Sequence, residues 1–254
     1  MDKQFGDVHV SDAGDFVALA EIQRAPNNFF DQALICSLAD AFAELDEDPS
    51  CRVIVLASEG KHFCAGANFG SNADREDRSK RTAEDGNPLY REAVRLFRNK
   101  KQVIAAVQGA AVGGGFGLAM MPDFRVACPE ARFTANFVKL GFTPGFGLTH
   151  TLPRIIGEQA ATDMFYTGRR IGGEEARKLG IVDRLVPQDQ VREAAIAYAR
   201  EIAENAPLAL ISLREQMRDG LADAVQKATD REGFEQFHLQ LTKDHKEGVK
   251  AVSE

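Results

Sequence analysis

The sequence predicts an α/β fold for its first half, followed by a mainly helical region. The run VIVLAS at 53–58 is almost continuously apolar, which is typical of a strand covered on both faces of a sheet. An earlier strand pattern, FVALAEI at 16–22, is separated from it by apolar residues at helical spacing over 31–46. A strand, a helix and a strand of these lengths indicate a parallel crossover. Beyond about residue 155, strand patterns vanish and helical patterns follow one another.

The remaining elements are predicted from the same periodicities. In the first half they are a helix over 89–98, a strand over 102–108, a helix over 114–121 and a strand over 124–128. The expected helices of the second half span 157–166, 173–179, 189–204, 207–219 and 221–241. Asp189 follows Pro187 and is expected to cap the third of these helices. Because the last helices keep apolar faces, we expect them to pack partly on another subunit.

Composition narrows the class of protein. The 254 residues include 44% hydrophobic and 27% charged residues, with a formal net charge of −7. This acidic balance disfavours nucleic acid as the main partner. No apolar run approaches the length of about 18 residues that a membrane span needs, and the first residues lack the apolar core of a secretory signal. The four cysteines form no C-x-x-C pair, and the five histidines are scattered. We therefore expect a cytoplasmic protein with reduced, buried cysteines and no metal site.

A polar segment, GSNADREDRSKRTAEDGN at 70–87, interrupts the α/β pattern. It carries charges of both signs and has a glycine near each end. Such a composition is typical of a solvated loop, and it also suits a lid that orders when substrate binds.

The glycines of AAVGGGFGLAM at 110–120 have two explanations. A dinucleotide fingerprint is excluded, because the third glycine of a motif beginning at Gly113 would fall on Leu118. Tight packing of a strand against a helix also selects glycine. Alternatively, a helix start without side chains lets a backbone N–H approach a carbonyl oxygen that gains negative charge. A second donor of this kind is available in KHFCAGANF at 61–69, where small residues again follow a strand.

Together these stretches resemble the enoyl-CoA hydratase/isomerase (crotonase) superfamily. The resemblance includes HFCAGAN at 62–68, AAVGGGFGLAM at 110–120, LGFTPGFGLTHTLPRIIG at 140–157 and YTGRRIGGEEARKLGIVDRLVP at 166–187. It implies a crotonase-like spiral of ββα turns with a C-terminal helical trimerisation region. The spiral core would span 1–190 and the helical region for oligomer packing 191–254, assembled as a homotrimer or a dimer of trimers.

The resemblance also implies a site for an acyl-CoA thioester, with coenzyme A as part of the substrate and no separate cofactor. The N–H groups of Ala67 and Gly114 would stabilise an enolate-like thioester oxygen. The implied substrate-binding residues are Ala25, Asn27, Ala65, Asn68, Phe69, Gly113, Gly117, Leu118, Asn136, Phe137, Leu140, Phe142 and Thr143. Of these, Leu118, Phe137, Leu140 and Phe142 would line the acyl pocket. Arg24 or a residue of the lid would meet the CoA phosphates.

The sequence departs from the family at the reacting groups. The two glutamates of the hydratases are replaced by Gly117 and Phe137, and the aspartate of the dienoyl isomerases is replaced by Gly145. Adding water to an enoyl thioester requires a deprotonated water and a proton for the α-carbon, and neither glycine nor phenylalanine supplies them.

Other residues are possible replacements. His62 is a candidate base. Thr143 and Asn136 are candidates for orienting a water molecule or a polar group of the substrate. Tyr90 and Glu92 lie on a helix that can border the acyl pocket, although Glu92 also suits a solvated face. His150 is expected to have a packing role.

Two functions remain from the sequence. The first is a lyase or isomerase acting on acyl-CoA, in fatty-acid or related metabolism. Decarboxylation of a malonyl-type thioester suits the missing carboxylates, because loss of CO₂ needs no base to begin. The second is a non-catalytic acyl-CoA binder or scaffold with the same fold. RNA binding is disfavoured by the acidic charge.

Overall fold

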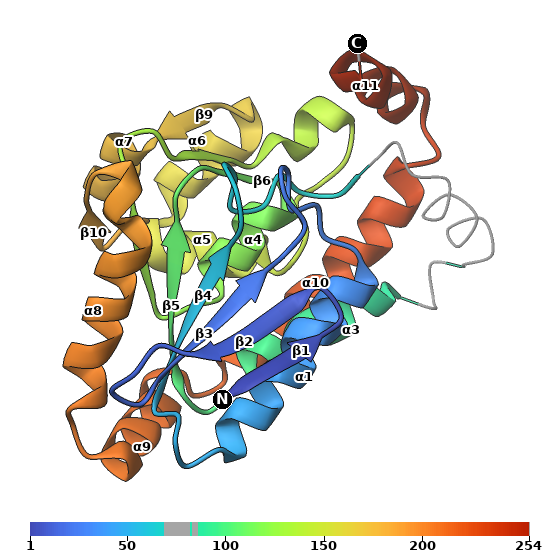
Figure 1. Cartoon of the computed structure of the whole chain (residues 1–254). Helices are drawn as coiled ribbons and strands as arrows, with labels where there is room; N and C mark the ends of the chain where they lie inside the picture. Colours follow the sequence, from blue (N-terminus) through green and yellow to red (C-terminus); the bar gives the residue numbers. More distant parts are fainter. Residues whose placement is uncertain (69–81, 83–85, 254) are drawn as a thin grey trace.

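The computed structural model describes residues 1–68, 82 and 86–253, with the side chains of 252 and 253 excluded. Its main sheet has the strand order β1-β2-β3-β4-β5-β7-β10 (Figure 1). The first three strands pair in antiparallel fashion, and β3 to β10 pair in parallel. The strands are β1 (Asp2–Phe5), β2 (Val8–Asp12), β3 (Val17–Ile22), β4 (Val53–Ser58), β5 (Gln102–Val107), β7 (Phe124–Ala127) and β10 (Arg184–Leu185).

A second, smaller sheet has the order β6-β8-β9. Its strands are β6 (Ala110–Val112), β8 (Arg132–Thr134) and β9 (Arg170–Gly172). Strand β6 follows β5 after two residues, so the chain passes directly from the main sheet into the second sheet. The turn that leaves β6 therefore lies beyond the carboxyl end of β5, where the candidate site is located.

Helices cover the main sheet on both sides. Helix α8 (Val191–Ala203) packs along β3, β4, β5 and β7. Helix α1 (Gln32–Glu47) packs on β1, β2 and β3, and α3 (Pro88–Phe97) lies between α1 and α10 (Leu221–Leu239). Figure 1 shows this group on the other side of the strands from α8. The buried positions of α1 recur at helical spacing, as the sequence predicts.

Eight further helices occur in the described part of the chain. They are α4 (Gly114–Met120), η2 (Asn136–Leu140), α5 (Leu148–Ile156), α6 (Glu158–Thr167), α7 (Gly173–Leu179), η3 (Gln188–Gln190), α9 (Pro207–Met217) and α11 (Lys243–Ser253). Helix α10 packs on α3 and α5, and α11 packs on η2. Both of these late helices therefore contact their own chain.

Two details of the sequence prediction are wrong. Asp189 does not cap the long helix, because it lies within the short helix η3 and the N-cap of α8 is Gln190. Strands do not vanish after residue 155, since β9 and β10 both occur there. Strands of three and two residues are too short to produce a recognisable alternation, which explains why the pattern missed them.

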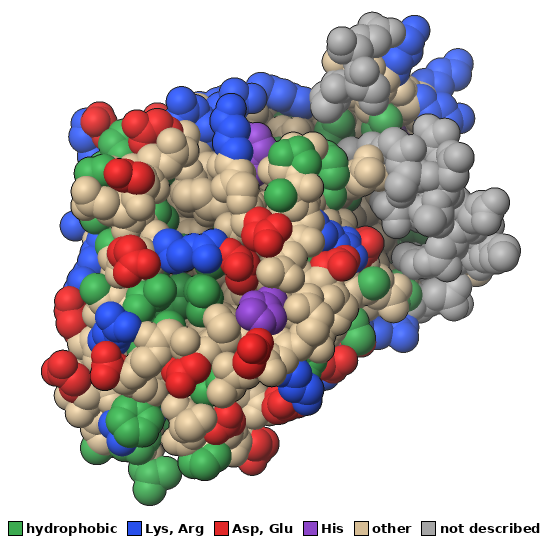
Figure 2. All heavy atoms as spheres, in the orientation of Figure 1, with side chains coloured by type: hydrophobic (Ala, Val, Ile, Leu, Met, Phe, Trp, Pro, Cys, Tyr) green, Lys and Arg blue, Asp and Glu red, His purple; other side chains and the backbone are tan. Residues whose placement is uncertain are grey.

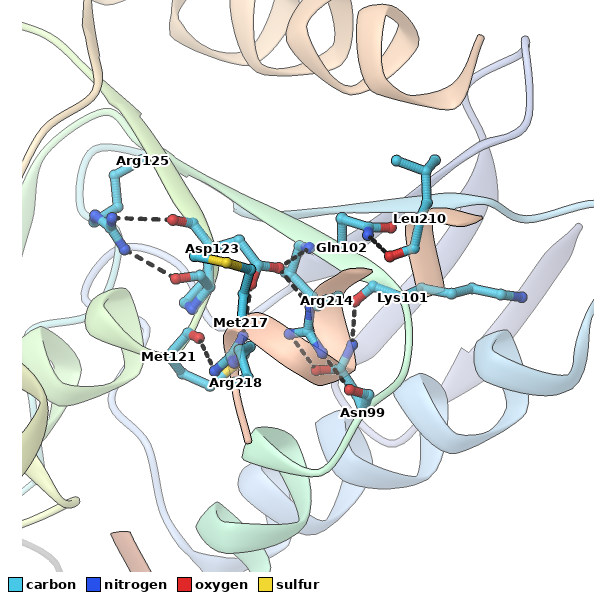
Figure 3. Close-up of polar contacts among 12 residues, drawn as sticks. Asn99, Lys101, Gln102, Met121, Asp123, Arg125, Leu210, Arg214, Met217 and Arg218 are labelled. Atoms are coloured by element: carbon cyan, nitrogen blue, oxygen red, sulfur yellow. Dashed lines mark hydrogen bonds and ion pairs between the residues drawn. The ribbon is translucent and has the colours of Figure 1, made fainter. Parts of the chain in front are cut away.

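A buried ionic cluster attaches α9 to the main sheet (Figure 3). Arg214 Nε donates to Asp123 Oδ2 over 2.8 Å, and Arg218 Nη1 donates to Asp123 Oδ1 over 2.9 Å. Nearby, Gln102 Nε2 donates to the carbonyl of Leu210 over 2.7 Å. Burial alone would raise the pKa of Asp123, but the two guanidinium groups outweigh it and the pKa of this carboxyl is lowered. Asp123 is therefore the ionised centre of the cluster.

The surface carries charges of both signs. Figure 2 shows lysine, arginine, aspartate and glutamate side chains intermixed among the described residues on that face. Within the described part of the chain, no helix has the length and apolar character needed to cross a membrane.

Candidate active site

The two glycine- and alanine-rich turns lie against each other. The N–H of Cys64 donates to the carbonyl of Ala110 over 3.0 Å, and the N–H of Val112 donates to the carbonyl of Cys64 over 3.0 Å. A Cβ atom at Gly115 would lie 2.2 Å from the Cys64 carbonyl oxygen. Any other residue at 115 would push the turns apart, so this glycine is required by close approach.

An early segment of the chain holds the first turn from its other side. The N–H of Ala65 donates to the carbonyl of Asn27 over 2.9 Å, and that of Phe30 donates to Gly66 over 3.0 Å. Phe30 also forms a parallel β-bridge with Ala67. The turn at 64–67 is thus held between residues 27–30 and 110–112.

Asn28 connects this early segment to the end of β4. Its side chain is fully buried, and its Nδ2 donates to the carbonyls of Glu59 over 2.8 Å and His62 over 2.7 Å. Its Oδ1 accepts from the N–H of Arg24 over 3.1 Å. These bonds satisfy the buried amide, which therefore holds the segment at 59–62 that leads into the turn at 64–67.

The N–H groups of Ala67 and Gly114 are the two donors that the sequence predicts for the site. Gly114 is buried at the first position of α4, where an N–H has no partner within the helix. Among the described residues, neither N–H donates a hydrogen bond. The ring of Phe30 lies against Gly114, where an added Cβ would meet Phe30 Cζ at 2.2 Å. Phe30 therefore contacts both turns.

Aromatic side chains occupy the space at positions 117, 137 and 145. A Cβ atom at Gly117 would lie 2.6 Å from Phe146 Cβ. A Cβ atom at Gly145 would lie 1.9 Å from the Tyr90 hydroxyl oxygen. At the remaining position, the buried ring of Phe137 packs edge-on against Phe142 with centroids 5.6 Å apart. None of these three positions offers an acid or base on its own side chain.

The structure brings several of the predicted substrate-binding residues together. An added Cβ at Gly113 would lie 3.5 Å from Asn136 Oδ1 and 3.7 Å from Phe137 Cζ. Leu118 and Leu140 are buried. Phe69 and most of the predicted lid, at 70–81 and 83–85, lie outside the described residues. The assignment of binding roles stays a prediction.

The candidate bases from the sequence have ordinary structural partners. Burial lowers the pKa of His62, with a smaller contribution from Lys61, so its imidazole is neutral near pH 7. Glu92 pairs with Arg95 over 2.5 Å. Burial likewise lowers the pKa of His150. The carboxyl of Glu92 thus belongs to a partly exposed ion pair.

Two other reactive side chains have similarly local partners. Arg24, the candidate for the CoA phosphates, is held by Asp7 over 2.5 Å and Asp31 over 2.8 Å, which neutralise its charge. Burial raises the pKa of Cys64 to about 12, which makes this thiol a poor nucleophile. Among the described residues, no group of three or more His, Cys, Asp or Glu side chains is arranged to hold a metal ion.

Sequence reasoning missed residues that act across the fold. The residues missed are Asn28, Phe30, Phe146 and Gln236. Of these, Phe30 and Phe146 pack together with ring centroids 5.8 Å apart. Asn28 directly follows the predicted binding residue Asn27, and this was the available signal, since asparagine side chains in turns often bond to backbone groups.

Comparisons with known proteins agree with this geometry. The family model for enoyl-CoA hydratase/isomerase matches residues 12–254. A protein provisionally named enoyl-CoA hydratase in Thermus thermophilus is 36% identical over 226 residues, covering 86% of each chain. A carnitinyl-CoA dehydratase from Salmonella typhi is 34% identical, covering 83% of this chain and 80% of the relative. A solved structure from a dehydratase/decarboxylase enzyme couple of polyketide β-branching is 25% identical, with a TM-score of 0.85 and coverage of 98% and 96%.

The chain belongs to the enoyl-CoA hydratase/isomerase family. The predicted family and the predicted crotonase-like fold are both confirmed. The protein is therefore a member of a family of enzymes that act on acyl-CoA thioesters.

Proposed function

We propose that this protein binds an acyl-CoA thioester and stabilises an enolate of it between the N–H groups of Ala67 and Gly114. One observation carries the proposal. The two N–H groups belong to turns that are hydrogen-bonded to each other, and both lack an acceptor among the described residues. Gly114 is buried and Ala67 is partly buried, so an acceptor for their N–H groups is favourable, and a thioester oxygen that gains negative charge is a strong acceptor.

Decarboxylation of a malonyl-type thioester suits this site best. The bond between the α-carbon and the carboxylate breaks, CO₂ leaves, and the electron pair passes to the thioester oxygen as the enolate forms. A proton from solvent then reaches the α-carbon. These reaction steps need hydrogen-bond donors to the thioester oxygen but no carboxylate base. The presence of Gly117 and Phe137, which carry no carboxylate, agrees with this requirement. The relative from a dehydratase/decarboxylase couple supports chemistry of this class.

Coenzyme A would enter as part of the substrate, without a separate cofactor. We propose that the chain assembles as a trimer or a dimer of trimers. The exposed apolar side chains of α9 support this assembly, since Leu208 is 81% exposed and Met217 is 67% exposed in the single chain.

Two double variants test the donor role of Gly114. Phe30→Ala removes the ring that blocks a side chain at 114. In that background, Gly114→Ala keeps the N–H, whereas Gly114→Pro removes it at a helix position that tolerates proline. We expect the proline variant to turn over its best substrate about 10²–10³-fold more slowly than the alanine variant.

The substrate is first found by incubating wild-type protein with enoyl, malonyl-type, β-keto and aromatic acyl-CoA thioesters and following products by mass spectrometry. Equal turnover by the two double variants would contradict the donor role, provided both bind coenzyme A. Tight binding of a thioester without turnover of any member of the panel would favour the non-catalytic acyl-CoA binder.

A further inference from the structure

A buried polar cluster, formed by Tyr90, Thr143, Gly145 and Gln236, lies beside the candidate site. The hydroxyl of Tyr90 donates to Gln236 Oε1 over 2.8 Å, and Gln236 Nε2 donates to the carbonyl of Thr143 over 2.9 Å. The four residues come from α3, from α10 and from the loop between η2 and α5. We call them the Tyr90 cluster.

The loop that carries Thr143 and Gly145 is linked through two aromatic pairs to the turn at 113–114. Phe142, at one end of the loop, packs on Phe137, whose ring lies 3.7 Å from a Cβ position at Gly113. Phe146, at the other end, packs on Phe30, whose ring lies against Gly114. The Tyr90 cluster is therefore connected to the site at both ends of its loop.

Helix α10 is attached to this loop by hydrogen bonds. Besides the bond from Gln236, the carboxylate of Glu232 accepts from the N–H of Gly147 over 2.8 Å and from the N–H of Thr149 over 3.0 Å. The Tyr90 hydroxyl and Gln236 Nε2 would lie 1.9 and 2.6 Å from a Cβ atom at Gly145. The polar atoms thus stand where a side chain at 145 would otherwise be.

Two groups of the Tyr90 cluster have an unused capacity for hydrogen bonds. The Oγ1 atom of Thr143 is buried and has no partner among the described residues. The N–H of Gly145, which is also buried, donates to none of them either. Buried hydroxyl and amide groups without partners are rare in proteins. Each of the two groups is therefore able to bond to a polar atom of a ligand.

We propose that the Tyr90 cluster binds an oxygen atom carried by the acyl chain of the substrate. The Gly145 N–H donates to this oxygen, and the Thr143 hydroxyl donates or accepts. The protein then selects thioesters whose acyl group bears a hydroxyl, carbonyl or carboxylate oxygen over plain alkyl thioesters. This inference rests on the proposed function, because it requires that an acyl-CoA occupies the site.

Calorimetric titration of the full chain tests the inference. The probes are butyryl-CoA, 3-hydroxybutyryl-CoA, 4-hydroxybutyryl-CoA and succinyl-CoA. We expect at least one oxygen-bearing thioester to bind the wild-type protein about tenfold more tightly than butyryl-CoA. Thr143→Val should abolish this preference, and Thr143→Ser should retain it.

A matched control makes the same chemical change at another buried threonine. Thr151 Oγ1 already donates to the carbonyl of Gly147 over 3.1 Å, so Thr151→Val should leave the preference unchanged. Because the Thr143 hydroxyl is unpaired, Thr143→Val should melt at or above the wild-type temperature without ligand.

Three outcomes would overturn the inference. The wild-type protein could show no preference for oxygen-bearing thioesters over butyryl-CoA, the preference could survive Thr143→Val, or Thr151→Val could lose the preference to the same extent as Thr143→Val. A water molecule that satisfies the Tyr90 cluster permanently would produce the first of these. Failure to bind any thioester, butyryl-CoA included, would instead contradict the proposed function itself. The butyryl-CoA titration distinguishes the two failures.

Discussion

At the scale of the residue, Gly117 bears on which reactions are expected of this protein. The position has no space for a side chain, because Phe146 occupies it. A glutamate at this position would therefore clash with Phe146. The neighbouring Gly114 is restricted in the same way by Phe30. Two phenylalanines thus shape the backbone on which the proposed chemistry depends.

This packing leads to a prediction for Gly117→Glu. We expect the variant to lose about 1–3 kcal/mol of unfolding free energy, because the core is overpacked, and to gain no hydration of crotonyl-CoA. Urea denaturation and absorbance of the enoyl thioester check the two parts. The double variant Gly117→Glu with Phe146→Ala is the control, because it supplies the space. Brisk hydration by the wild-type protein would show that a different base acts.

At the scale of the element, the ionic cluster at Asp123 decides how α9 meets the sheet. The side chain of Arg214 is 5% exposed and that of Asp123 is 15% exposed, so the pair is largely shielded from solvent. Arg218 adds a second buried cation. Removing the carboxylate would leave two guanidinium groups buried without a counter-charge. Helix α9 is therefore sensitive to a single side chain.

We expect Asp123→Asn to cost about 3–5 kcal/mol of unfolding free energy near neutral pH. Because the folded protein lowers the pKa of Asp123, this stabilisation is present above the unfolded value of about 3.9 and is lost as pH falls through the folded pKa below it. The difference in unfolding free energy between the wild-type protein and Asp123→Asn should be constant from about pH 5 to 8 and shrink below about pH 4.

Urea denaturation at several pH values measures this difference. Asp223→Asn is the matched control, since Asp223 pairs with Arg98 over 3.1 Å on the surface and should change stability by less than about 1 kcal/mol. An Asp123→Asn variant as stable as this control would show that the cluster contributes nothing to the attachment of α9.

At the scale of the whole molecule, the exposed apolar side chains of α9 bear on assembly. Leu208 and Leu213 are 81% and 55% exposed in the single chain. If copies of the chain bury them, Leu208→Glu with Leu213→Glu should reduce the assembly to monomers, because burying two carboxylates is costly. Light scattering after gel filtration measures the mass. A wild-type monomer, or a variant with unchanged assembly and melting temperature, would contradict the proposed interface.

Much of the fold was predictable because its signals are local. The strand at 53–58 and the helix now seen at Gln32–Glu47 each follow from a periodic pattern in one stretch of chain. The short strands β9 and β10 were missed, since they exist through pairing with distant strands. Of the candidate site, the two turns were predictable from their small residues. Their aromatic and amide supports were not, because they come from other elements.

By itself, then, the sequence determined the α/β core and the two backbone turns, since apolar periodicity and glycine spacing are properties of neighbouring residues. The family followed from the resemblance of its motifs. Only the tertiary structure decided that Phe146 fills the place beside Gly117, and that Tyr90 and Gln236 meet Thr143. These contacts join residues that are distant in the chain. The contacts of Tyr90 and Gln236 with the loop that carries Thr143 arise because α3 and α10 pack together beside it. No local pattern in the sequence specifies this packing.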